Sequence, residues 1–124
     1  METAESTMDA IVIRVTSTGA EVVSIKEFAG EAKLQRGVER EGQLYYRLLN
    51  GDDQMVAEGS FADPRSLHYD TVIEGTDGEL AGGRIKLPSA EILVRVPSDK
   101  GAETIELTDY TEDPEGVFLG KLSL

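Results

Sequence analysis

The sequence lacks cysteine and tryptophan, and it has a single histidine, His68, among its 124 residues. Without cysteine the chain cannot form disulfide bonds, thiolate zinc sites, iron–sulfur clusters or a cysteine nucleophile. A two-histidine metal site is excluded, and the H-E-x-x-H zinc motif is absent. The glycine-rich motifs G-x-x-x-x-G-K-[ST] and G-x-G-x-x-G, which hold phosphates and dinucleotides, are absent as well. These absences argue against the commonest metal- and nucleotide-dependent enzymes.

Basic residues are also scarce. The chain has 12 lysines and arginines against 24 acidic residues, for a net charge of −12. Such a surface repels phosphate backbones and anionic lipid, so we expect no nucleic-acid partner. No apolar run approaches the roughly 18 residues of a membrane-spanning helix, so we expect no membrane insertion. The acidity favours solubility, and it is also compatible with a surface for divalent cations or a basic partner.

The first ten residues, METAESTMDA, have neither the basic region nor the apolar region of a signal peptide. We interpret residues 1–9 as a disordered leader or the edge of an excised segment. At this length the remainder fits one domain with a substantial core, and we assign residues 10–124 to a single β-sandwich domain.

The clearest structural pattern is a hairpin over Gly42–Phe61. Its first strand alternates apolar and polar residues, and Asn50-Gly51-Asp52-Asp53 is a typical turn sequence. The residues expected on the inward face of the two strands are Leu44, Tyr46, Leu48, Met55, Ala57, Gly59 and Phe61. Further strands are predicted over Ile11–Thr16, Glu21–Phe28, Leu67–Glu74, Arg84–Leu87, Glu91–Val96, Glu103–Tyr110 and Val117–Leu124.

Between these strands the turns contain glycine and proline, as in Gly75–Gly78 and Asp113–Gly116. Residues 29–41 are expected to be irregular, with a short strand over Lys33–Gln35. In the last strand, Phe118, Leu122 and Leu124 are expected to share a face. About eight or nine short strands at this spacing predict an all-β fold, an antiparallel immunoglobulin-like β-sandwich.

Four carboxylates precede the last strand within seven residues, and they form the candidate metal site of the sequence. They are Asp109, Glu112, Asp113 and Glu115. Oxygen-rich loops at the end of a sandwich can bind calcium, usually with help from backbone carbonyls. The same residues are ordinary turn chemistry, so a solvated turn is the alternative. No other cofactor is expected.

Catalysis and carbohydrate binding have weaker support. Ser66, His68 and Asp70 alternate along one predicted strand, so their side chains point the same way and do not converge as a catalytic triad requires. Carbohydrate-binding sandwiches usually present a row of exposed aromatic side chains. Here Tyr46 and Tyr69 fall on inward faces, and Tyr45 is expected on an exposed face, but a single tyrosine is not a platform. We therefore predict that the protein is not an enzyme.

The order of strands and turns resembles the N-terminal sandwich domain of secreted bacterial metallopeptidases of the IgA-peptidase type. The resemblance lies in an opening strand that leads into T-G, a strand pair with tyrosine and phenylalanine, a strand after a proline, and a late D-P turn. These elements are Ile11–Gly19, Tyr45–Phe61, Leu87–Ile92 and Asp113-Pro114. Ser60 separates the Gly59 and Phe61 that the family has adjacent.

The resemblance implies an extracytoplasmic accessory module, periplasmic or at the cell surface, that contacts a neighbouring domain or a protein partner. It carries no functional residues to this chain, because the chemistry of the family resides in a separate peptidase domain. The sequence thus predicts a non-catalytic interaction module, with a calcium- or carbohydrate-binding sandwich as the alternative.

Overall fold

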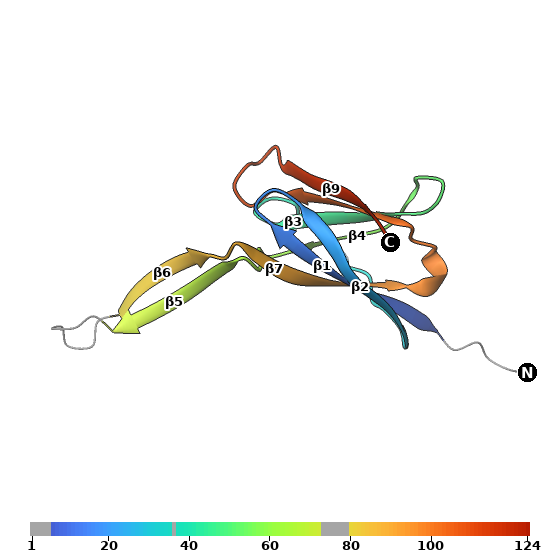
Figure 1. Ribbon diagram of the computed structural model, residues 1–124, viewed down its shortest axis with the longest axis horizontal. Coiled ribbons are helices and arrows are strands. Elements are labelled where there is room, and N and C mark those ends of the chain that lie inside the picture. Colours follow the sequence, from blue (N-terminus) through green and yellow to red (C-terminus); the bar gives the residue numbers. More distant parts are fainter. Residues whose placement is uncertain (1–5, 36, 73–79) are drawn as a thin grey trace, which may run out of the picture.

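Figure 1 shows the computed structural model as two packed β-sheets with a two-stranded arm that extends to one side. The structure describes residues 6–35, 37–72 and 80–124, and leaves the side chains of residues 67–84 undescribed. The elements are β1 (Thr7–Thr16), β2 (Ala20–Ala29), β3 (Leu44–Leu49), β4 (Met55–Phe61), β5 (Ser66–Val72), β6 (Leu80–Lys86), β7 (Ser89–Pro97), the 3₁₀-helix η1 (Ser98–Lys100), β8 (Thr104–Asp109) and β9 (Val117–Ser123). The predicted antiparallel β-sandwich is confirmed, with nine strands in the described residues, and its immunoglobulin-like identity stays a prediction.

The sandwich consists of a three-stranded sheet in the order β2-β1-β7 and a four-stranded sheet in the order β4-β3-β8-β9. Neighbouring strands in both sheets are antiparallel. Strand β1 is the middle strand of the smaller sheet, and it begins at Thr7, inside the segment that the sequence analysis assigned to a leader. The predicted turn at Gly75–Gly78 lies outside the described residues.

The core lies between the two sheets and follows the period-2 pattern of the strands. Alternate residues of β1 and β7 face the four-stranded sheet, as the alternation of Ile92, Val94 and Val96 predicts. Each such aliphatic side chain contributes about 1.5–3 kcal/mol when fully buried. The core residues are Ile11, Ile13, Val15, Leu44, Tyr46, Leu48, Ala57, Ile92, Val94, Val96, Ile105, Leu107 and Leu119.

Two side chains that the alternation placed in the core point outward instead. Met55 is exposed because the pairing of β3 with β4 shifts register beside Leu49, at the end of the hairpin. Phe118 is 58% exposed because the pairing of β8 with β9 shifts register directly after it, at Leu119. There Leu119 takes the buried place, and Gly120 adopts a φ of 151° that favours glycine. A β-bulge adds one residue and reverses the faces beyond it.

The segment between β2 and β3 has no strand over residues 33–35, so that part of the prediction is wrong. Instead, the side chain of Gln35 acts as a short substitute for a neighbouring strand. The Ser60 N–H donates to Oε1 of Gln35 at 2.8 Å, and Nε2 of Gln35 donates to the Ser60 carbonyl at 3.1 Å. Because β4 is an edge strand, this amide covers backbone groups that would otherwise be open to pairing.

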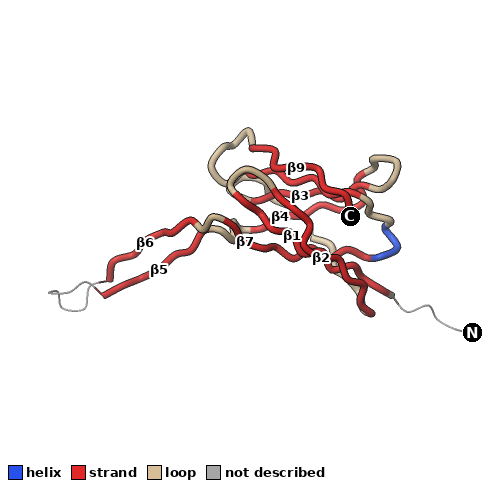
Figure 2. The backbone as a smooth tube through the Cα atoms, in the orientation of Figure 1, coloured by secondary structure: helices blue, strands red, loops and turns tan. Residues whose placement is uncertain are grey.

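The arm formed by β5 and β6 projects from the sandwich (Figures 1 and 2). Its two strands pair from Ser66 with Lys86 to Val72 with Leu80, and they form a sheet of their own. The pair Gly82-Gly83 lies within β6. Because the arm forms a separate sheet, it is joined to the sandwich at its base, around Arg65 and Leu87.

Arg65 anchors that base. Its side chain is 1% exposed, and its Nη1 donates to the carbonyl of Thr16 at 2.6 Å, at the end of β1. Its Nε donates to Asp63 at 2.9 Å and its Nη2 donates to Asp109 at 2.7 Å. Its own carbonyl accepts a hydrogen bond from the Leu87 N–H at 2.6 Å. One guanidinium thus joins both sheets of the sandwich to the start of the arm.

Candidate functional site

The outward face of the three-stranded sheet carries more apolar surface than a solvated sheet face requires. On β1, Met8, Ala10 and Val12 alternate with the core residues and therefore point away from the four-stranded sheet. Phe28 of β2 lies opposite Met8, and Leu93 of β7 lies opposite Val12. Phe28 and Leu93 are 48% and 41% exposed. We call these five residues, with Lys26 and Arg95, the β1 outer face.

This face is hollowed at its centre. The hollow is shallow and open to solvent, with a volume of about 400 Å³, and is lined by Met8, Ala10, Val12, Ser24, Lys26, Phe28, Leu93 and Arg95. Ala10 forms its floor because it has the smallest side chain of its row and larger side chains stand around it. A concave apolar surface with a few polar groups at its rim is the usual form of a binding site.

The charges on the rim are both positive. Ala10 lies opposite Lys26 on β2 and opposite Arg95 on β7, so the two cations flank it in one row across the sheet. In the part of the chain that the structure describes, neither cation has a hydrogen bond or an ion pair. Other basic side chains do hold carboxylates, namely Arg14, Arg47, Arg65, Lys86 and Lys121.

A second row of the same face shows how charges pair across this sheet. Arg14 lies opposite both Glu21 and Glu91, and its guanidinium contacts their carboxylates at 2.6 and 3.4 Å. In this row, the arginine of the central strand β1 neutralises the carboxylates of both neighbouring strands. In the Ala10 row the central strand supplies only a methyl group, so Lys26 and Arg95 stay uncompensated.

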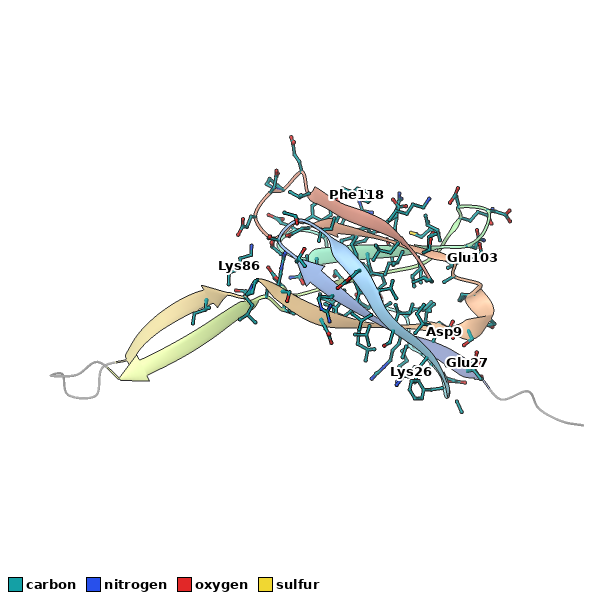
Figure 3. The ribbon with its side chains drawn as sticks, viewed as in Figure 1. Asp9, Lys26, Glu27, Lys86, Glu103 and Phe118 are labelled. Atoms are coloured by element: carbon teal, nitrogen blue, oxygen red, sulfur yellow. The ribbon has the colours of Figure 1, made fainter. Side chains whose placement is uncertain are left out.

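The outward face of the four-stranded sheet is different. Phe118 lies on this face, and Figure 3 shows Phe118 and Lys26 on opposite sides of the sandwich. Tyr45 points outward but is only 5% exposed, so the expectation of an exposed Tyr45 is wrong. The Arg40 guanidinium lies over its ring at 4.4 Å, and Tyr110 meets it edge-on at 6.3 Å. Its hydroxyl donates to Glu58. Burial, with the hydrogen bond to Glu58, raises the pKa of Tyr45. A ring covered in this way gives little platform for a sugar, and carbohydrate binding stays a prediction.

The four predicted calcium ligands have separate partners. Asp109 accepts hydrogen bonds from the N–H and hydroxyl of Thr111 at 2.8 and 2.5 Å, besides its contact with Arg65. Glu112 pairs with Lys86 at 3.0 Å.

Asp113 and Glu115 belong to the predicted turn, which is present. The Gly116 N–H donates to the Asp113 carbonyl at 3.0 Å, and the Glu115 N–H donates to the Asp113 carboxylate at 2.9 Å. Among the described residues, no group of three or more acidic or histidine side chains is placed to hold a metal ion. The calcium site therefore stays a prediction that needs a rearrangement of these contacts.

Calcium binding can be measured directly. If the four carboxylates bind calcium, millimolar calcium should raise the melting temperature, and a chelator should reverse the rise. The variant Asp113→Asn should lose the effect, while Asp52→Asn in the hairpin turn should keep it. An unchanged melting temperature at millimolar calcium would remove this site from consideration.

The β1 outer face was not predicted from the sequence. A signal was present, because residues 10–13 are apolar on both faces of the strand, and only Arg14 interrupts the run. This is unusual for a strand with one solvated face. The placement of the two cations on either side of Ala10 had no such signal, since only the order of the strands brings Lys26 and Arg95 to the same row. Comparison with protein-family models, curated proteins and solved structures found no match to this chain. The resemblance to the IgA-peptidase type thus stays a prediction.

Proposed function

We propose that this protein is a non-catalytic interaction module that binds a neighbouring domain or a partner protein through the β1 outer face. The observation that carries the proposal is the apolar hollow over Ala10, on a sheet face that the two-layer architecture leaves uncovered in the described residues. Apolar patches with a charged rim, on otherwise polar proteins, commonly mark protein contacts.

The rest of the molecule supports a protein rather than a lipid or nucleic-acid partner. The net charge of −12 opposes anionic polymers and surfaces. In the described part, no helix has the length and apolar character needed to cross a membrane. The proposed module belongs to an exported bacterial protein, periplasmic or at the cell surface, as the family resemblance implies.

A photo-cross-linking experiment tests this function. A benzoylphenylalanine residue is placed at Leu93, on the β1 outer face, in the full natural protein within its native cells. The matched position is Phe118, which is more exposed but lies on the opposite side of the sandwich. We expect a discrete cross-linked product from Leu93, identified by mass spectrometry, and little from Phe118.

The comparison between the two positions decides the outcome. A product from Phe118 with none from Leu93 would assign the contact to the other face and contradict the proposal. Products from neither position would contradict the interaction-module function itself. Because both residues are exposed, neither replacement is expected to change the melting temperature by more than a few degrees.

A further inference from the structure

The partner chemistry that suits the hollow can be inferred from the row of Lys26, Ala10 and Arg95. We propose that the β1 outer face receives a carboxylate side chain of a partner protein, seated over Ala10, with an apolar residue on each side of it. The inference rests on the proposed function and adds the class of group that the site recognises.

The first support is the spacing of the two cations. Adjacent strands are about 4.8 Å apart, so the backbones of Lys26 and Arg95 lie about 10 Å apart across β1. Both side chains are long and line the same hollow, so both can reach a carboxylate at its centre. Guanidinium and ammonium groups bind carboxylates with short, charge-assisted hydrogen bonds.

The second support is the contrast with the neighbouring row. Where β1 carries Arg14, the flanking strands carry Glu21 and Glu91, and all three side chains meet. Where β1 carries Ala10, the flanking charges are both positive and the central position is empty of charge. In the Arg14 row, the central side chain therefore neutralises both of its neighbours. In the Ala10 row, the carboxylate that would do the same is missing from the central strand.

The third support is the apolar surface on both sides of that row. Met8 and Phe28 lie along one side of Ala10, and Val12 and Leu93 lie along the other. Residues on one face of a strand are about 7 Å apart, which matches the spacing of alternate side chains in an extended segment. An extended segment with the pattern apolar–x–acid–x–apolar would therefore satisfy all three rows.

A second copy of this chain is a poor occupant in a symmetric arrangement. A twofold axis through the hollow would bring Lys26 and Arg95 of one copy against the same cations of the other. Like charges in direct apposition are destabilising, and each copy has a net charge of −12. The chemistry instead favours a partner that supplies the acid.

The cation arrangement is tested without any partner by three substitutions of similar size. Ala10→Glu places a carboxylate between Lys26 and Arg95, Ala10→Gln is its neutral counterpart, and Ala10→Lys adds a third cation. We expect melting temperatures in the order Glu above Gln above Lys, with the Glu–Lys difference reduced in 1 M salt. Equal melting temperatures for the Glu and Lys variants would overturn the proposal.

The ligand chemistry is tested with two peptides, acetyl-Leu-Ser-Glu-Ser-Leu-amide and the same peptide with glutamine at its centre. Amide shifts in ¹H–¹⁵N spectra of the full chain report binding at residues of the hollow. We expect the glutamate peptide to bind there, the glutamine peptide to bind at least fivefold more weakly, and Ala10→Glu to abolish binding.

Cation variants complete the test. Lys26→Gln and Arg95→Gln should each weaken binding of the glutamate peptide by about two- to fivefold. Lys100→Gln should not, because Lys100 is an exposed cation that does not line the hollow. Equal binding of the two peptides, shifts elsewhere on the molecule, or no shifts at 5 mM peptide would each overturn the proposal. A cross-linked product from Leu93 together with any of these results would leave the interaction function standing and the carboxylate proposal refuted.

Discussion

Replacing Arg65 by alanine should cost about 3–5 kcal/mol of unfolding free energy, one of the two largest single-residue effects that we expect. The substitution leaves the carboxylates of Asp63 and Asp109, which are only 4% and 15% exposed, without their shared cation. It also frees the carbonyl of Thr16 from its hydrogen bond. Chemical denaturation should show a lower midpoint, and the melting temperature should fall by on the order of 10–20 °C.

Arg47→Ala is the matched control, because Arg47 also pairs with a carboxylate, that of Glu106 at 3.1 Å, but is 48% exposed. Glu106 is 17% exposed, but the Arg47 guanidinium is open to water, so the pair should contribute about 1 kcal/mol or less and this variant should stay close to wild type. Arg65→Lys should rescue little, since one ammonium cannot replace the three-sided contact of the guanidinium. Equal losses for Arg65→Ala and Arg47→Ala would show that the anchor contributes nothing beyond an ordinary surface pair.

The same cluster gives stability a pH dependence. Burial, the largest influence, raises the pKa of Asp109, but hydrogen bonds from Thr111 and Arg65 outweigh it and leave that pKa below its ordinary value of 3.8. The unfolded chain therefore binds the proton more readily than the folded chain. This contribution to stability is present above the unfolded-state pKa and is lost as the pH falls through the folded-state pKa.

Denaturation at pH 7 and at pH 3 measures that contribution. Asp109→Asn has no carboxylate to protonate at this position, so it should lose less stability between the two pH values than wild type does. Asp53→Asn, on an exposed loop, should behave like wild type. The opposite sign, with Asp109→Asn losing more stability at low pH, would contradict the lowered pKa.

The strands could be predicted from the sequence because each depends on local alternation. β7 is the clearest case, since Ile92, Val94 and Val96 fall inward as their spacing requires. The errors at Met55 and Phe118 have one cause. A bulge is a property of the pairing between two strands, and the alternation within one strand contains no record of it.

Arg65 and the β1 outer face were beyond prediction for a different reason. The Asp-Pro-Arg sequence indicates the end of a strand, but the partners of Arg65 in the sandwich lie 49 and 44 residues away in the chain. Likewise, Ala10 lies opposite Arg95 only because β7 pairs with β1. Contacts of this kind follow from the strand order, which short-range patterns leave undetermined.

Gly59→Ala tests the packing of the hairpin, and we expect it to cost about 2–3 kcal/mol. Gly59 lies opposite Tyr46 in the pairing of β3 with β4, and the tyrosine ring covers it. A Cβ at Gly59 would overlap the ring, including its Cε1 at 2.5 Å. The ring has little room to move, because it is 6% exposed and stacks on Phe61 at 5.5 Å. Overlap with a buried ring forces a shift of core side chains or of the strand itself.

A double-mutant cycle with Tyr46→Leu separates this overlap from other effects of losing a glycine. Shortening Tyr46 removes the overlap, so the two substitutions together should cost clearly less than the sum of their separate costs. Gly19→Ala is the matched control, since its Cβ would meet only the Leu119 carbonyl oxygen at an ordinary 3.7 Å. That variant should stay within about 1 kcal/mol of wild type. Strictly additive costs at Gly59 and Tyr46 would mean that the ring does not rest on the glycine, and that this hairpin packs differently.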